Sequence, residues 1–213
     1  FQIRFSSDAI FTPGNEPDVL VAMNAAALKR HLPELKRSGL LVVNTDGFGA
    51  SDLRKAGYDS NPMEDGSLEG YQVVAAPMTE LTEKALAESS LSTSDKKRCK
   101  NLYALGLLYW LFHRERAPTE RWLQEKFARK PELVEANLTA LKAGHLYGEL
   151  NELFQTRYCL PSAKLPPGTY RNIEGNLALA YGFVAAAQRA GVTLFQGSYP
   201  ITPATDVLHH LSR

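Results

Sequence analysis

Continuous apolar runs alternate with helically spaced apolar residues in the first part of the chain. Residues 18–24 (DVLVAMN) and 40–46 (LLVVNTD) each contain an unbroken apolar run, which is typical of a buried strand. The residues between them, 25–39, have helical spacing and predict a helix that ends near Gly39. A strand–helix–strand succession of this length predicts a crossover between parallel strands of a sheet covered by helices.

Two more segments predict strands. Residues 1–5 (FQIRF) alternate apolar and polar side chains, as in a half-buried strand. Residues 70–78 (GYQVVAAPM) form another apolar run. The segment that follows, 79–89, predicts a helix capped by Thr79.

The middle of the chain is helical throughout. Residues 101–112 (NLYALGLLYWLF) predict a nearly all-apolar helix, too short to span a bilayer and therefore buried in protein or in an interface. Residues 117–130, with Thr119 as a cap, and 131–150, with a proline at the start, predict two further helices. The three together predict a helical cluster beside the sheet.

Residues 160–172, with three prolines and a glycine, predict an extended connector between two domains. Residues 175–191 predict a helix of small residues, in which Gly182 and neighbouring alanines would allow another backbone to approach closely. Residues 191–196 (GVTLFQ) predict a strand, and 204–211 a helix.

A tight turn precedes this last helix. Thr202 stands where an N-cap belongs, and Pro203 at the first helical position, where a missing N–H costs nothing. The free amides of such a helix N-terminus are a natural anion site. A well-capped helix without a ligand is the alternative interpretation.

Composition narrows the class of protein. The 213 residues are 44% hydrophobic with a formal net charge of +1, which argues against a nucleic-acid or membrane-surface binder. The densest basic stretch, 95–101 (DKKRCKN), is interpreted as a solvated helix start. No apolar run reaches membrane-spanning length, so we expect a cytoplasmic protein. The first residue is not Met and the last lies in a helical pattern, so we expect a piece of a longer polypeptide.

Few side chains suggest metal or nucleotide chemistry. Two cysteines, Cys99 and Cys159, cannot provide a four-thiolate site, and the five histidines lack metal-ligand spacing. Gly47-x-Gly49 lacks the third glycine of a dinucleotide fingerprint, so residues 46–51 are expected to form a surface loop.

Residues 170–212 resemble the start of the pyrimidine-binding thiamin diphosphate domain of 2-oxoacid:ferredoxin oxidoreductases. The resemblance rests on the segment YPITP, preceded by the helix start Gly175-Asn176. Residues 17–44 are similar to the gamma domain of this family. Residues 100–112, 121–144 and 165–172 are similar to the form in which gamma and alpha domains are fused, as in the alpha subunit of 2-oxoglutarate:ferredoxin oxidoreductase.

The resemblance implies an α/β fold. We expect a three-layer α/β/α gamma-type domain with a helical cluster over 1–159 and a linker over 160–172. The start of a thiamin diphosphate pyrimidine-binding α/β domain would follow over 173–213. Two family features would lie outside this chain: the glycine-rich strand–turn that opens the gamma domain, and the acidic residue that activates the aminopyrimidine.

The resemblance also implies an enzyme subunit. The reaction would be oxidative decarboxylation of a 2-oxoacid to acyl-CoA and CO₂, and we expect the 2-oxoacid to be 2-oxoglutarate. Coenzyme A would be the co-substrate, and the electrons would pass to ferredoxin. Thiamin diphosphate would be shared with a partner beta subunit that holds Mg²⁺ and a [4Fe–4S] cluster and contacts ferredoxin. Thr202 would anchor the substrate carboxylate, and the residues in contact with thiamin would be Tyr199, Pro200, Ile201 and Pro203.

Two alternatives stay open. The chain could be a non-catalytic assembly or scaffold subunit, in which the gamma domain and connector only hold other parts together. It could also belong to a relative specific for pyruvate or another 2-oxoacid, because no residue that contacts the substrate's side chain can be identified.

Overall fold

The computed structural model describes residues 2–8, 10, 14–151, 153–154, 157–171 and 173–212. The chain divides into two compact units, Phe1–Lys164 and Leu165–Arg213, each of which is described by itself. The division falls inside the segment predicted to be a connector. The assignment of 1–159 and 173–213 to a gamma-type and a thiamin-binding domain stays a prediction.

Three parallel strands form the sheet in the described part of the first unit, in the order β1-β2-β3. They are β1 (Val19–Ala22), β2 (Leu40–Asn44) and β3 (Gln72–Ala76). The pairing register places Leu41 between Leu20 and Val73. The strands predicted over 18–24, 40–46 and 70–78 are thereby confirmed.

The strand predicted over 1–5 is wrong for residues 2–5, which have no strand pairing; Phe1 lies outside the described residues. The alternating pattern there serves a different contact, since the Phe5 ring packs edge-on against Phe112 with 5.0 Å between ring centroids.

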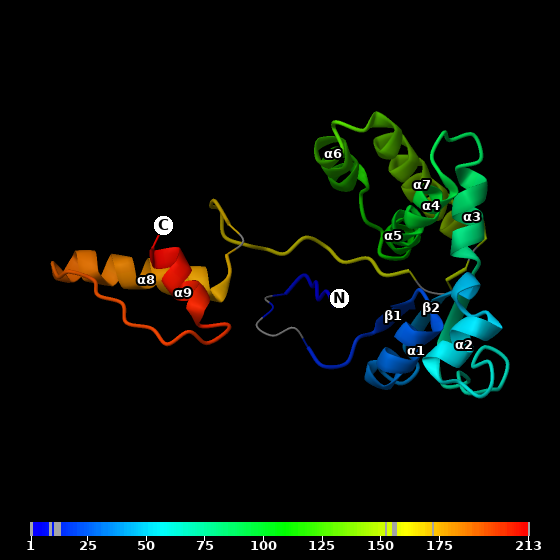
Figure 1. Cartoon of the computed structure of the whole chain (residues 1–213), viewed down its shortest axis with the longest axis horizontal. Helices are drawn as coiled ribbons and strands as arrows, with labels where there is room; N and C mark the ends of the chain where they lie inside the picture. Colours follow the sequence, from blue (N-terminus) through cyan, green and yellow to red (C-terminus); the bar gives the residue numbers. More distant parts are fainter. Residues whose placement is uncertain are drawn as a thin grey trace. The chain divides into compact units, whose positions relative to one another are not determined.

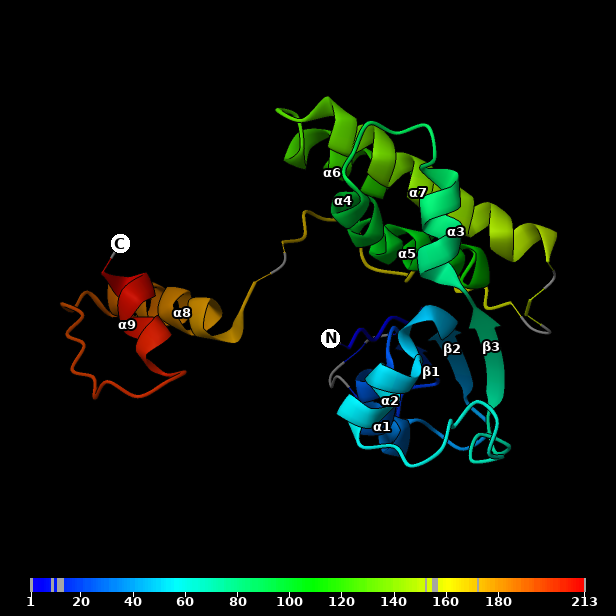
Figure 2. The same cartoon turned by 45° about the vertical axis from the view of Figure 1, so that its right-hand side comes forward.

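Seven helices and two short 3₁₀ turns accompany this sheet in the described residues (Figures 1 and 2). The helices are α1 (Ala25–His31), α2 (Ala50–Ala56), α3 (Met78–Ala85), α4 (Thr93–Arg98), α5 (Lys100–Leu111), α6 (Ala117–Lys126) and α7 (Pro131–Leu150); the turns are η1 (Leu32–Glu34) and η2 (Thr45–Gly47). In Figure 2, α3 continues directly from the end of β3. Within the described residues every helix is too short or too polar to cross a bilayer.

Each face of the sheet is covered by a different set of helices. One face carries Leu41 and Val43 into a core with Leu28 of α1, and Leu53 of α2 packs at its edge. The other face belongs to a second core, whose buried residues from the sheet and from α5 and α7 include Val42, Val74, Tyr103, Leu107 and Ala140. This arrangement confirms the three-layer α/β/α architecture with a helical cluster.

The first helix is shorter than predicted. It ends at His31 and continues only as η1, although the apolar spacing runs to Gly39. Pro33 explains the difference, because it has no N–H to donate to the carbonyl of Lys29 and so interrupts the α-helical hydrogen bonds.

Helices α5 and α7 cross with their backbones in direct contact. A Cβ added at Gly106 would overlap the carbonyl oxygen of Leu141, and one at Gly144 would overlap the carbonyl oxygen of Tyr103. Two glycines therefore allow the crossing. The apolar helix predicted over 101–112 corresponds to α5. Its residue Leu107 is fully buried, and the residues that cover it belong to this chain.

The second unit consists of α8 (Gly175–Ala190) and α9 (Thr205–Leu211), packed against each other. The strand predicted over 191–196 is wrong, because these residues have no strand pairing. A β-branched run becomes a strand only where another strand satisfies its backbone groups. The close backbone approach predicted at Gly182 is also absent, since nothing in the described residues lies within 4 Å of a Cβ built there.

Candidate functional site

Residues 199–203 form an exposed, irregular segment that leads into α9. Tyr199 is 80% exposed and Ile201 58% exposed, and Thr202 is exposed between Ile201 and Pro203. The Thr202–Pro203 peptide bond is cis. In the described part of the chain the Thr202 hydroxyl has no hydrogen-bond partner. The segment therefore presents an available hydroxyl between apolar side chains.

The predicted capping role of Thr202 is wrong. Helix α9 begins at Thr205, and Ala204 occupies the N-cap position without a side-chain hydrogen bond. Residues 202–204 form a turn, because the Ile201 carbonyl accepts both the backbone N–H of Thr205 (3.0 Å) and its hydroxyl (3.1 Å). Pro203 consequently stands before the helix and not at its first position.

The anion site predicted at this helix start also loses its donors. The first three amides of α9 are already used: Thr205 donates to Ile201, Asp206 to the Pro203 carbonyl at 3.2 Å and Val207 to the Ala204 carbonyl at 3.2 Å. A carboxylate could not be held by these amides without displacing the turn. The first three amides of α9 therefore do not provide the predicted anion site.

Sequence reasoning missed the residue that ties this segment to α8. The side-chain amide of Asn176 donates from Nδ2 to the Pro203 carbonyl at 3.0 Å. The Gly175-Asn176 helix start contributed to the family resemblance. A contact between residues 27 positions apart cannot be predicted from the local sequence pattern.

Open α/β sheets commonly bind ligands at the carboxyl ends of their strands. In this chain, polar side chains at these ends hydrogen-bond to other residues of the chain itself. Asn44, fully buried at the end of β2, donates from Nδ2 to the Met23 carbonyl (3.3 Å) and to the Thr79 hydroxyl (3.2 Å). Its Oδ1 accepts the backbone N–H of Met78 at 2.9 Å. One buried amide thus joins β1, β2 and α3.

Asp46 completes the cap of α3. Its Oδ2 accepts the backbone N–H groups of Thr79 (2.8 Å) and Glu80 (3.0 Å). Thr79 is inside the helix, so its predicted capping role is wrong: two side chains from β2 and η2 satisfy the amides that a local cap would have taken. Thr119 is likewise inside α6, where its hydroxyl bonds the Tyr109 hydroxyl at 2.6 Å. The polar side chains at the carboxyl ends of the strands therefore stabilise the fold.

Replacing Asp46 with alanine should lower the free energy of unfolding by about 1 kcal/mol, the usual cost of losing a capping carboxylate. Urea unfolding followed by circular dichroism measures the change. Asp52→Ala is the matched control, because the carboxylate of this exposed aspartate in the first turn of α2 accepts no hydrogen bond in the described residues. Equal midpoints for the two variants would contradict the capping role.

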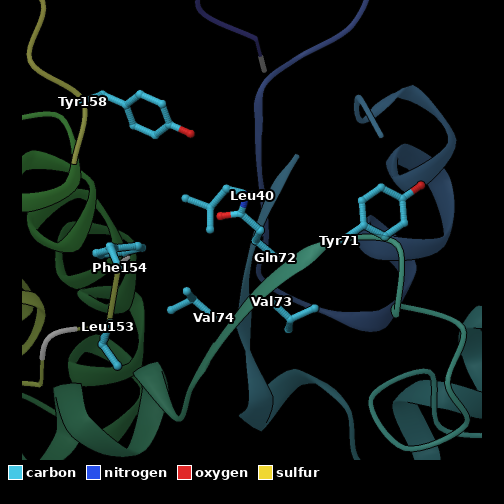
Figure 3. Close-up of a pocket in the computed structure, with 8 residues that line it drawn as sticks. All are labelled: Leu40, Tyr71, Gln72, Val73, Val74, Leu153, Phe154 and Tyr158. Carbon is cyan, nitrogen blue, oxygen red and sulfur yellow. The ribbon is translucent and has the colours of Figure 1, made fainter. Parts of the chain in front are cut away.

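A cavity of about 310 Å³ lies between β3 and the chain that follows α7 (Figure 3). Leu153, Phe154 and Tyr158 form one wall, and Leu40, Gln72 and Val74 the other, while the side chains of the lining residues Tyr71 and Val73 point away from Phe154. Among the described lining residues, the polar groups that face the cavity are the Gln72 amide and the Tyr158 hydroxyl, and none is a carboxylate, imidazole, thiol or amine. For acid–base chemistry the described lining therefore offers only a tyrosine hydroxyl.

The segment that forms this wall is fastened to the end of α5. Tyr158 donates its backbone N–H to the Leu111 carbonyl at 2.9 Å. The Arg157 guanidinium lies 3.5 Å from the centre of the Trp110 ring and contacts His113 Nδ1 at 3.0 Å. Residues 157–158 therefore belong to the first unit.

The two cysteines occupy different environments. Cys99 is 2% exposed, and burial, together with the nearby Asp95 carboxylate, raises the pKa of its thiol. Cys159 is exposed, and both thiols are free. Within the described residues no three His, Cys, Asp or Glu side chains group as metal ligands.

A thiol reagent such as iodoacetamide should therefore modify Cys159 at least about tenfold faster than Cys99 at pH 7, since the thiolate is the reactive form and access is required. Mass spectrometry of the labelled protein identifies the site. Cys159→Ser should remove the fast reaction, and denaturant should expose Cys99. Fast labelling of Cys99 in the folded protein would contradict its buried position.

Comparison with known proteins supplies the family. The model of the family described as pyruvate ferredoxin/flavodoxin oxidoreductase matches residues 1–147. The chain is 52% identical over all its 213 residues to the 2-oxoglutarate oxidoreductase subunit KorA of Mycobacterium tuberculosis, of which it covers 33%. It is 25% identical over 135 residues, 63% of this chain and 20% of the relative, to subunit alpha of 2-oxoacid:ferredoxin oxidoreductase 1 from Aeropyrum pernix. The chain thus spans about a third or less of these relatives.

A solved structure has the same fold. The 2-oxoglutarate:ferredoxin oxidoreductase from Magnetococcus marinus, with 2-oxoglutarate, coenzyme A and succinyl-CoA bound, matches 96% of this chain and 31% of its own, with a TM-score of 0.66 and 24% identity. That likeness concerns the fold. Since the family model covers most of the sequence, the chain belongs to the pyruvate ferredoxin/flavodoxin oxidoreductase family.

Proposed function

We propose that this chain is part of the alpha subunit of a 2-oxoglutarate:ferredoxin oxidoreductase. The subunit would take part in the oxidative decarboxylation of 2-oxoglutarate to succinyl-CoA and CO₂, with electrons passed to ferredoxin. The observation that carries the proposal is 52% identity to the Mycobacterium tuberculosis KorA subunit along the entire chain, including both units. The chain's free thiols fit a reducing cytoplasm, where we place the enzyme.

The segment 199–203 is the proposed contact with thiamin and substrate. The exposed side chains of Tyr199 and Ile201 offer an apolar surface suited to the aminopyrimidine ring, and Pro200 and Pro203 limit the backbone around them. When bound, thiamin diphosphate supplies the nucleophilic carbon and the electron sink needed to release CO₂ from a 2-oxoacid. These residues fit one wall of such a site, and none of them is acidic.

Thr202 is the proposed anchor of the substrate carboxylate. Its hydroxyl is exposed and has no hydrogen-bond partner in the described residues, so it can donate to a carboxylate oxygen without breaking an existing bond. Holding the carboxylate there would fix the orientation of the adjacent keto carbon.

The remaining cofactors are assigned to a partner beta subunit. Two cysteines cannot ligate a [4Fe–4S] cluster, and the buried Cys99 already directs its thiol to the Asp95 carbonyl at 3.4 Å. We therefore propose that the cluster, the Mg²⁺ and the diphosphate of thiamin are held by the partner, which also contacts ferredoxin. Coenzyme A is the proposed acyl acceptor.

The test is co-expression of the full subunit containing this chain with its beta partner, followed by a panel of 2-oxoacids with coenzyme A and with ferredoxin or a viologen as acceptor. The expected result is the highest kcat/KM for 2-oxoglutarate. A preference for pyruvate would reject the substrate assignment. A folded, assembled complex that reduces no acceptor with any 2-oxoacid would favour the scaffold alternative.

A further inference from the structure

We propose that Asn176 is a positioning residue that holds segment 199–203 in place against the start of α8. The inference rests on the proposed function only for its kinetic consequence. The contact itself is a hydrogen bond of 3.0 Å from Asn176 Nδ2 to the Pro203 carbonyl. Asn176 is half-buried at the second residue of α8.

The other hydrogen bonds of the segment are local. The Ile201 carbonyl accepts from Thr205, and the Pro203 carbonyl accepts from Asp206. These bonds join the turn to the start of α9 but not to α8. In the described part of the chain, Asn176 is the one side chain outside 198–207 that hydrogen-bonds the segment.

Packing cannot replace this bond. Tyr199 and Ile201 are mostly exposed, and among the described residues of this unit the buried hydrophobic ones are Ala180 of α8 and Val207 of α9. Ala180 lies one helical turn after Asn176, so both face the same side of α8. Val207 lies four residues after Pro203. The packing of α9 against α8 therefore holds the helix that follows the turn, and the Asn176 amide holds the turn itself.

The geometry predicts how a loss would appear. Without the Asn176 donor, the turn could pivot about the packed Val207, which moves the Thr202 hydroxyl relative to α8. A shift of this kind lowers the rate of a reaction that needs an aligned substrate, because productive orientation is lost well before binding is abolished.

The decisive variants are Asn176→Asp and Asn176→Gln, in the full subunit assembled with its beta partner. Asn176→Asp keeps the size of the side chain but places a carboxylate oxygen against the Pro203 carbonyl. Asn176→Gln keeps a donor on a longer stem and should rescue in part. Gln188→Ala is the matched control, because the side-chain amide of this exposed residue on α8 makes no hydrogen bond in the described residues.

Two measurements are made on each variant. Hydrogen exchange of the amides of residues 205–207 should be about tenfold faster in Asn176→Asp than in the unmodified complex. With 2-oxoglutarate, kcat should fall about tenfold in Asn176→Asp, and its effect should not add to that of Thr202→Ala in the double variant, because both act through the same hydroxyl.

The outcomes separate the two proposals. Unchanged exchange in Asn176→Asp, or an additive double variant, overturns the positioning role. Faster exchange with unchanged kcat, while Thr202→Ala is impaired, overturns it as well. Wild-type kinetics for Thr202→Ala would instead reject Thr202 as the substrate anchor, whereas faster exchange in Asn176→Asp would still support the positioning of the segment by Asn176.

Discussion

Replacing Gly144 with alanine should lower the free energy of unfolding of the first unit by about 3 kcal/mol, at the upper end of the cost of overpacking a core. The added Cβ would overlap the Tyr103 carbonyl oxygen. This neighbour is backbone inside a helix, so it cannot turn aside as a side chain could. Helices α5 and α7 would have to separate, and the apolar core they share with the sheet would open. Thermal or urea unfolding measures the change.

Two other glycines provide a graded comparison. Alanine at Gly148 would approach Trp110 Cδ1 at 2.6 Å, a side-chain atom that can move, so the loss should be smaller. Alanine at Gly182 in α8 meets nothing within 4 Å in the described part of the chain. It should leave the second unit unchanged or slightly more stable, because alanine favours helix. A Gly144→Ala protein with the unmodified midpoint would contradict the backbone contact.

The sequence predicted the elements whose signals are local. The three strands follow from unbroken apolar runs. The helix predicted over 131–150 agrees with α7 at both ends, and its start is explained by Pro131 at the first position. The glycine crossing was not predictable. Gly106 and Gly144 each look like an ordinary helix-weakening residue until the two helices are brought together.

Predicted caps failed for a physical reason. Thr79 and Thr202 each stand where a local cap could form, but other groups compete for the same amides. Asn44 and Asp46, more than thirty residues before α3, take its first N–H groups. The carbonyls of the 201–204 turn take those of α9. The local spacing of apolar residues predicts that a helix forms. The groups that accept hydrogen bonds from its first backbone amides depend on the tertiary fold.

Substituting Thr202 by aspartate should raise the KM for 2-oxoglutarate by about tenfold or more in the assembled enzyme. The new carboxylate would face the substrate carboxylate, and each tenfold corresponds to about 1.4 kcal/mol of lost binding. Folding should be unaffected, because the Thr202 side chain is exposed, caps no helix and has no hydrogen-bond partner in the described residues. Thr202→Ser keeps the hydroxyl and should bind substrate nearly as well as the unmodified enzyme.

The matched control is Thr193→Asp, which introduces the same charge at an exposed position of the same unit outside 199–203. Steady-state kinetics with 2-oxoglutarate and the unfolding midpoint are measured for all three variants. An increase in KM confined to Thr202→Asp, with unchanged midpoints, supports a carboxylate held at this hydroxyl. If Thr193→Asp raises KM equally, the effect is one of general charge on the unit, and if Thr202→Asp binds 2-oxoglutarate like the unmodified enzyme, the substrate carboxylate is anchored elsewhere.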